Sequence, residues 1–186
     1  NSLMDFVNVQ SNGKIAMKLD EGDKLINVRI CHENNDIMLA ARSGKCIRFP
    51  VTDVRVFVGR NSTGVRGIKL AAGDEVISMS ILNHSEATTE ERDEYARIRA
   101  AVKRIQAERG GECEVAPEES GVEMTVLTPE KYNFMKEQEQ FILSVTTTGY
   151  GKRTSSYEYR VTGRGGQGIA NMEMSARNKE IASSFP

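Results

Sequence analysis

The feature that most constrains this chain is an internal repeat of about fifty residues. Residues 13–26 align with residues 64–77 at an offset of 51, with six identities in fourteen positions. Average residue usage predicts roughly one such identity. Because fixed periods of about 20 to 50 residues are typical of solenoids and propellers, the sequence predicts an array of equivalent modules.

A second alignment continues the repeat beyond a long insertion. The stretch that starts at Ile37 aligns with the stretch that starts at Ile142 at an offset of 105, which is one period plus about 54 residues. We therefore expect half a module and a full one in residues 1–83, an insertion in 84–138, and the following module in 139–186. The identical pairs are Gly44/Gly149, Arg48/Arg153, Arg55/Arg160, Val56/Val161 and Glu75/Glu180.

Each full module is predicted to form four short antiparallel strands. Apolar and β-branched runs separated by glycine turns carry this prediction. Strands this short cannot bury an apolar face alone, so the modules must stack on one another. The fold class is therefore all-β, a propeller-like open array of about two and a half four-stranded blades with a partly helical insertion. The expected strands cover 37–41, 46–49, 65–70, 76–82, 141–146, 152–155 and 169–174.

The insertion is predicted to contain two helices. Thr88 and Glu91 have the spacing of a capping box, so a helix should begin there and end at the glycines 110–111. Residues 112–123 should lack fixed structure, and a short helix should start at Pro129. The first helix carries an apolar stripe that either packs on the chain itself or docks another protein. The stripe consists of Tyr95, Ile98, Val102 and Ile105.

Charge is distributed unevenly along the chain. Residues 84–138 hold 13 acidic and 8 basic residues, while the remainder holds 13 acidic and 17 basic residues. The net charge of -1 thus conceals a mildly basic body that carries an acidic insertion.

Basic residues of the body recur at corresponding places in successive modules. If the modules stack with a fixed rotation, these cations line one rim and form a path for a phosphate backbone. Arginine suits such contacts because its planar guanidinium binds phosphate through two hydrogen bonds. The alternative is that these charges only solvate the blades. The candidate DNA-binding residues are Lys45, Arg48, Arg55, Arg60, Arg66, Lys152, Arg153, Arg160 and Arg164.

Catalytic and metal-binding patterns are not evident. His32 and His84 stand in no Ser/His/Asp or metal-ligand pattern, and the three cysteines are widely spaced. The glycine-rich run 163–168 resembles a phosphate-binding loop but lacks the following Lys-Ser/Thr. We therefore expect no catalytic residue, metal or cofactor in this chain, no membrane span, and a cytoplasmic location.

Several strings are similar to the blade signature of one family. Residues 149–154, 157–160 and 163–169, and one blade earlier 53–55 and 59–68, resemble the C-terminal domains of bacterial DNA gyrase A subunits. The resemblance covers about 130 of the 186 residues. The gyrase A box of that family, Q-R-R-G-G-K-G, has no clean copy here, and residues 163–168 are a degenerate echo of it.

The resemblance implies a β-pinwheel, in which neighbouring blades exchange strands and a basic rim wraps duplex DNA. It also implies a role in ATP-driven negative supercoiling, together with the gyrase A N-terminal domain and the gyrase B protein. ATP and Mg²⁺ would then bind to other domains of the holoenzyme. Two alternatives remain: the C-terminal domain of the topoisomerase IV A protein, and a propeller that binds proteins, such as a WD-repeat domain, against which the absence of Trp counts.

Overall fold

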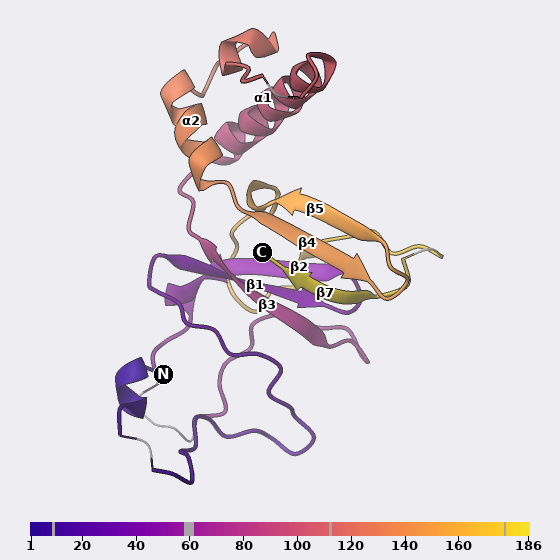
Figure 1. Ribbon diagram of the computed structural model, residues 1–186. Helices are drawn as coiled ribbons and strands as arrows, with labels where there is room; N and C mark the ends of the chain where they lie inside the picture. The colour runs from indigo at the N-terminus through magenta and orange to yellow at the C-terminus, as the bar shows by residue number, and fades with distance from the viewer. Residues whose placement is uncertain (9, 58–61, 112, 177) are drawn as a thin grey trace. The chain divides into compact units, whose positions relative to one another are not determined.

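The computed structural model describes residues 1–8, 10–57, 62–111, 113–176 and 178–186. Its elements divide between two compact units (Figure 1). The blade unit comprises Asn1–His84, Ile142–Thr154 and Val161–Pro186, and the insertion unit comprises Ser85–Phe141 and Ser155–Arg160. The strands are β1 (Asn35–Ala41), β2 (Lys45–Pro50), β3 (Val76–Asn83), β4 (Phe141–Thr146), β5 (Gly151–Ser155), β6 (Ile169–Ala170) and β7 (Ile181–Phe185). The α-helices are α1 (Thr89–Glu108) and α2 (Pro129–Gln138), and the 3-10 turns are η1 (Leu3–Phe6), η2 (Val51–Asp53), η3 (Pro117–Ser120) and η4 (Ser156–Glu158).

The predicted repeat is confirmed strand by strand. The strand order β3-β1-β2 in one sheet matches β7-β4-β5 in the other, and each pair of matching strands lies at the offset of 105. Even the register shifts correspond, because one falls between Ala40 and Ala41 and the other between Val145 and Thr146. The 3-10 turns η2 and η4 follow β2 and β5 at the same offset. The two modules therefore share one backbone plan.

The short strand β6 joins the modules. It belongs to the last module by sequence, yet it pairs antiparallel with β2 of the preceding one, Ala170 opposite Lys45 and Ile169 opposite Cys46. Gly168 precedes it with a φ of 72°, and a Cβ there would collide with the Cys46 carbonyl oxygen. Only glycine allows so close a backbone approach in this conformation. The last module thus completes the sheet of its neighbour.

Two strand predictions need correction. Residues 65–70, which lie within the described part of the chain, form no strand, and of 169–174 only Ile169–Ala170 does. Residues 65–70 correspond to β6, which pairs with the hairpin of the preceding module. They form no strand because the described residues before position 33 form no hairpin with which they could pair. The Lys69 amide instead donates to the Gly166 carbonyl at 2.8 Å.

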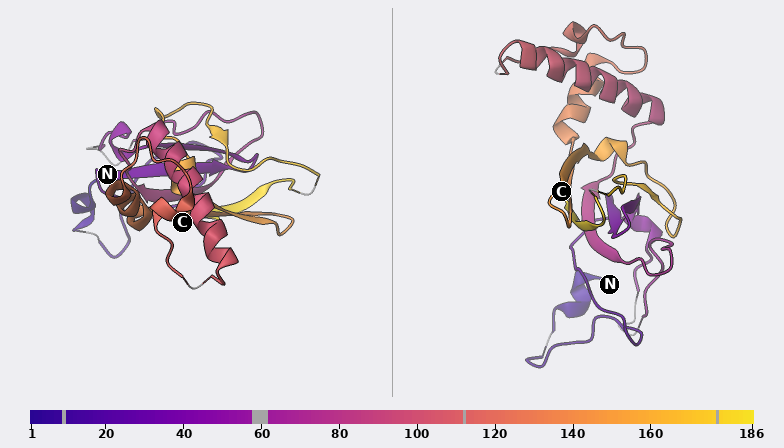
Figure 2. Two further views of the ribbon diagram at one scale, coloured as in Figure 1. Left: turned by 90° about the horizontal axis from the view of Figure 1, so that it is seen from above. Right: turned by 90° about the vertical axis from the view of Figure 1, so that its right-hand side faces the viewer.

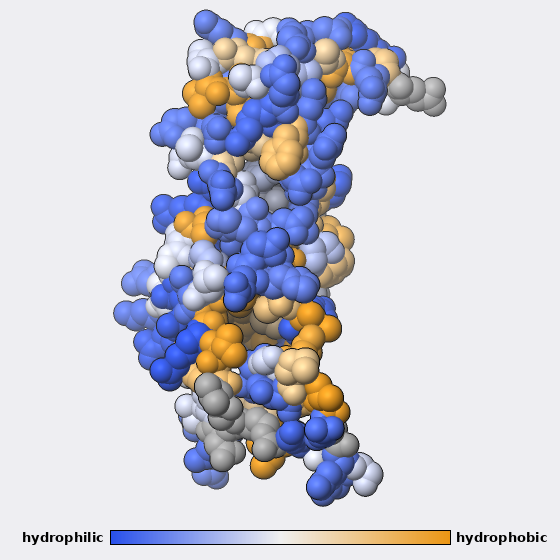
Figure 3. Space-filling model, turned by 90° about the vertical axis from the view of Figure 1, so that its left-hand side faces the viewer, coloured by the Kyte–Doolittle hydropathy of each residue, from blue (hydrophilic) through white to orange (hydrophobic). Residues whose placement is uncertain are grey.

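The N-terminal segment also forms no strands, although half a module was expected there. Residues 14–20 and 23–31 belong to no helix or sheet, and Figure 2 shows them as a trace without strand arrows. Ile15, Val28 and Ile30 are exposed by 65%, 69% and 68%. Hydrophobic surface is visible in the lower part of Figure 3, where Figure 1 places this segment. Alternating apolar residues alone do not form a strand without a partner edge.

One hydrophobic cluster of the first sheet is largely aliphatic. Ile47, Phe49 and Ile68 are buried and are surrounded by partly buried hydrophobic side chains. Burial of each such side chain contributes about 1.5–3 kcal/mol. Ile68 lies in the segment without strand structure, so packing rather than a ladder holds that segment on the sheet.

The insertion unit begins as predicted. Thr88 caps α1, since its hydroxyl accepts from the Glu91 amide at 3.2 Å and the Glu91 carboxylate accepts from the Thr88 amide at 2.8 Å. The apolar stripe of α1 packs inside the unit, with the Tyr95 ring centroid 5.1 Å from that of Tyr132 in α2. The self-packing alternative is therefore correct for this stripe. The second helix starts at Pro129 as expected.

A buried carboxylate fixes the return from α1 to α2. Glu94 is 1% exposed and accepts hydrogen bonds from the amides of Thr125, Val126 and Leu127, as well as from the Thr125 hydroxyl at 2.7 Å. Burial alone would raise the pKa of Glu94, but these four donors outweigh it and lower the pKa to about 2. The ionised carboxylate thus holds residues 125–127 against α1.

Residues 113–123 are more ordered than their composition predicts. They include the 3-10 turn η3, in which Pro117 and Ser120 are buried, and Val115 belongs to the core of the insertion unit. The prediction of missing structure is therefore wrong for this stretch, because two apolar anchors outweigh the acidic residues around them. Glu112 lies outside the described residues.

Candidate nucleic-acid interface

The two units carry opposite net charges. The blade unit holds 16 basic and 11 acidic residues, a net charge of +5, and the insertion unit holds 9 basic and 15 acidic residues, a net charge of -6. A polyanion is therefore attracted to the blade unit and repelled by the insertion unit. This division sharpens the contrast that the sequence alone indicates.

Three predicted cations lie on the surface of matching hairpins. Lys45 opens β2 and is exposed, and Lys152 and Arg153 are exposed in β5. The glycine turns before both strands have positive φ values, 88° at Gly44 and 86° at Gly149. These turns return the chain sharply, so the cations stand at the same end of each hairpin.

The connectors after these hairpins carry a second matched set. Arg55 follows η2, Arg160 follows η4 at the offset of 105, and both are exposed. The Arg55 guanidinium lies over the Phe57 ring, 4.9 Å from its centroid. This stacking leaves the guanidinium edges available to phosphate oxygens. Arg66 is exposed as well.

Arg164 has a structural function in addition to its charge. Its guanidinium is half-buried and donates from Nε to the Asp53 carbonyl at 3.1 Å and from Nη1 to the Arg66 carbonyl at 2.5 Å. The neighbouring Gly165 amide donates to the Gly67 carbonyl at 2.7 Å. The glycine-rich run 163–168 therefore connects the last module to the middle one.

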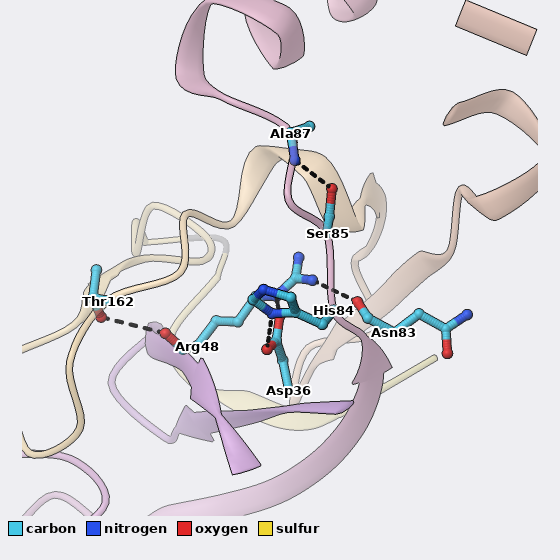
Figure 4. A network of polar contacts seen from close by, with 7 residues as sticks. All are labelled: Asp36, Arg48, Asn83, His84, Ser85, Ala87 and Thr162. Atoms are coloured by element: carbon cyan, nitrogen blue, oxygen red, sulfur yellow. Dashed lines mark hydrogen bonds and ion pairs between the residues drawn. The ribbon is translucent and has the colours of Figure 1, made fainter. Parts of the chain in front are cut away.

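Arg48 is a correction to the predicted set. Its side chain is 2% exposed and forms an ion pair with the fully buried Asp36, with 2.8 Å between Nε and Oδ2. A further bond runs from Nη2 to the Asn83 carbonyl at 2.8 Å (Figure 4). A guanidinium enclosed in this way cannot reach a phosphate, so Arg48 stabilises the blade and does not bind DNA.

His84 completes the same network. Its Nδ1 lies 2.7 Å from the second carboxylate oxygen of Asp36, and its side chain is 36% exposed. The sequence predicts a solvated surface histidine here, which is only partly correct because one ring nitrogen is engaged. Figure 4 shows Arg48, from β2, and His84, which follows β3, converging on Asp36.

Sequence reasoning missed further surface cations. Lys18 and Lys69 are exposed and occupy the same position in successive modules, at the offset of 51. Their identity in the repeat alignment was the available signal. It also missed Arg42, which forms ion pairs with Glu75 and with Glu180 at 3.3 Å, two glutamates at equivalent positions. Arg60 of the predicted set lies outside the described residues.

Other chemistry finds little support in the described part of the chain. It holds no group of three or more His, Cys, Asp and Glu side chains placed to bind a metal ion. Burial raises the pKa of the Cys46 thiol to about 12, which makes it a poor nucleophile. Among the described residues, neither helix is long and apolar enough to cross a membrane.

The fold and the surface charge define a class of protein, the propeller-like repeat domains in which neighbouring blades share strands. Comparison with known families makes this specific. The family profile described as DNA gyrase C-terminal domain, beta-propeller, matches residues 5–32, 35–83 and 140–180 and omits the whole insertion, residues 84–138. The chain belongs to this family.

Relatives of known name agree. The DNA gyrase A subunit of Granulibacter bethesdensis is 53% identical over 196 residues, covering 100% of this chain and 21% of that protein. The corresponding protein of Rickettsia bellii is 48% identical, covering 99% and 20%. The chain thus spans about a fifth of the length of these relatives.

A solved structure supports the fold. The crystal structure of the C-terminal domain of DNA topoisomerase IV superposes with a TM-score of 0.57 at 16% identity, covering 91% of this chain and 36% of that one. At this identity the likeness concerns the fold alone. The propeller prediction is confirmed, and neither the topoisomerase IV nor the protein-binding alternative is favoured.

Proposed function

We propose that this chain binds and bends duplex DNA within the A subunit of a DNA gyrase, where it supports ATP-driven negative supercoiling. Membership of the gyrase C-terminal family and the net charge of +5 on the blade unit support this proposal. Contacts are to phosphates and do not depend on base sequence, because the exposed groups are arginine and lysine side chains on hairpins and connectors.

The observation that carries the proposal is the recurrence of exposed cations in successive modules. Arg55 and Arg160 share one position of the repeat, and Lys45, Lys152 and Arg153 lie on matching hairpins. Each cation that neutralises a phosphate releases a condensed counterion, which supplies affinity at low salt. A duplex that follows such cations from module to module must bend, and the phosphate contacts offset the bending energy.

The holoenzyme supplies everything else. The partners are duplex DNA, the gyrase A N-terminal domain and the gyrase B protein, while ATP and Mg²⁺ bind to those other parts. The working location is the bacterial cytoplasm, at the nucleoid. No catalytic residue is assigned within these 186 residues.

Binding of the full-length protein to duplex DNA at several salt concentrations tests the proposal. Log K decreases with log salt, and the magnitude of this negative slope decreases by about 0.9 for each phosphate that is no longer neutralised. Lys152→Gln with Arg153→Gln should therefore reduce the magnitude of the slope by roughly 1.8. Two duplexes of unrelated sequence should give the same slopes.

The matched control removes two exposed cations from the insertion unit. Lys103→Gln with Arg104→Gln changes the total charge equally but should leave the slope unchanged. Equal losses from both double variants would mean that only the net charge matters. A slope near zero for the wild-type protein would refute electrostatic binding altogether.

A further inference from the structure

The insertion unit contains one segment that is not part of the insertion. Residues 155–160 form the connector after β5, yet they group with residues 85–141 in a single compact unit. Tyr157 of this connector belongs to the buried core that α1 and α2 form. The core of the insertion is therefore closed by a side chain of the repeat itself.

Three contacts hold the connector in this unit. The Tyr157 ring stands edge-on to Tyr95, with 5.2 Å between centroids, and its hydroxyl donates to the Met135 carbonyl at 2.9 Å. The Ser156 amide donates to the Gln140 carbonyl at 2.8 Å. Helices α1 and α2 and the segment before β4 each supply one partner, so the connector is held from three directions.

The insertion unit is itself stiff enough to act as a support. Glu139, just after α2, accepts from the Tyr95 hydroxyl at 3.0 Å and from Arg99 Nε at 3.3 Å, and both donors belong to α1. Glu94 fixes the loop before α2 through backbone amides. Buried, satisfied polar networks of this kind restrict motion.

The matching connector of the middle module is built differently. The three residues of η2 all stay at least partly exposed, and Thr52 stands where Tyr157 stands in the last module. There the arginine of the connector, Arg55, stacks on Phe57. In the last module the position of Phe57 is taken by Thr162, so the repeat does not place an aromatic ring at this point beside Arg160.

We infer that the insertion braces the connector of the last module, with Tyr157 as the positioning residue that keeps Arg160 where it meets DNA. The brace replaces the stacking that Phe57 provides to Arg55. The acidic insertion then contributes to DNA binding without contacting DNA, in agreement with the net charge of -5 on residues 84–138. The inference rests on the proposed function only for the role of Arg160.

Hydrogen exchange on the full-length protein tests the brace without DNA. Tyr157→Ala should accelerate exchange of the amides 156–160 by about tenfold, because local opening no longer has to break the tyrosine contacts. Tyr157→Phe, which keeps the ring but loses the hydrogen bond to the Met135 carbonyl, should show a smaller increase. The control variant Thr52→Ala should leave the exchange rates of the amides 156–160 unchanged. In Tyr157→Ala the exchange rates of the β4 amides should also stay unchanged. Unaltered exchange at 156–160 in Tyr157→Ala would overturn the brace.

A double-mutant cycle on DNA binding tests the link to Arg160. Arg160→Gln should reduce the salt slope by about 0.9, Tyr157→Ala should reproduce this loss, and the double variant should be no worse than either. Additive losses would show that Tyr157 does not act through Arg160 and would overturn its positioning role. If Arg160→Gln has no effect while Tyr157→Ala weakens binding, the same role is overturned. If neither weakens binding, the assignment of Arg160 to DNA fails, and the exchange result alone decides the brace.

Discussion

Two arginines at equivalent positions of the two modules differ in solvent exposure. Arg48 in β2 is buried against Asp36, whereas Arg153 at the same position of β5 is exposed. The backbone around them is alike, with the same strand order and the same bulge. The residue type on the adjacent strand differs: the last module has Phe141 at the position that corresponds to Asp36. A repeat thus determines where the backbone of an arginine lies, and the surroundings in each module determine how deeply its side chain is buried.

The comparison is tested most strongly by removing the buried partner. Arg48→Met removes the arginine partner of the buried Asp36 carboxylate, which retains its contact with His84, and should reduce the free energy of unfolding by about 3–5 kcal/mol. Arg153→Met, at the equivalent position on the surface, should cost clearly less than Arg48→Met. Denaturant unfolding measures both. Similar losses from the two variants would mean that the two arginines are in similar environments after all.

Each of the two units contains a fully buried acidic residue, Asp36 in the blade unit and Glu94 in the insertion unit, and their partners differ. Asp36 is held by side chains, whereas Glu94 is held by backbone amides and Thr125. Glu94→Ala leaves three amides without their acceptor and should reduce the stability of the insertion unit by about 3 kcal/mol. Denaturant unfolding followed by a probe within residues 85–141 measures this loss, and an unchanged midpoint would contradict it.

The same carboxylate predicts a pH dependence. Its pKa is lowered in the folded state to about 2, so its stabilisation is complete above the unfolded value of 4.5 and is lost as the pH falls from there towards 2. Thermal unfolding followed between pH 6 and pH 2 should show this loss in the wild type and a smaller one in Glu94→Gln. A wild-type profile that matches Glu94→Gln would contradict the assignment.

Gly64 and Gly168, which correspond after a one-residue gap in the repeat alignment, have different surroundings. Gly168 and Gly64 both have positive φ, but a Cβ would meet the Cys46 backbone at Gly168 and only Met17 Cε, at 3.8 Å, at Gly64. Gly168→Ala should therefore cost about 2 kcal/mol or more, and Gly64→Ala about 1 kcal/mol. Chemical unfolding of the two variants, compared directly, would expose an error if their order were reversed.

Local features of this fold were predictable from the sequence. The capping residue Thr88, the helix start at Pro129 and the hairpin turns depend on neighbours within a few positions. The repeat alignment also predicted the correct equivalence of β1, β2 and β3 with β4, β5 and β7.

Features that depend on distant partners were not predictable. The segment 65–70 reads as a strand, but whether it forms one depends on a hairpin of another module. The sequence alone indicates that Arg48 is a surface cation, but the structure pairs it with the buried Asp36. It indicates the same for Arg164, whose guanidinium donates to the Asp53 and Arg66 carbonyls. Exposure of a charged side chain is a property of the assembled sheets, and periodicity does not encode it.

The central claim is that equivalent cations of successive modules contact one duplex. The most direct measurement is the salt slope of duplex binding for Arg55→Gln, Arg160→Gln and the double variant of the full-length protein. Each single variant should reduce the magnitude of the slope by about 0.9 and the double variant should reduce it by about 1.8. A reduction from only one of the two positions, or none from the double variant, would show that the repeated arginines do not form one path for DNA.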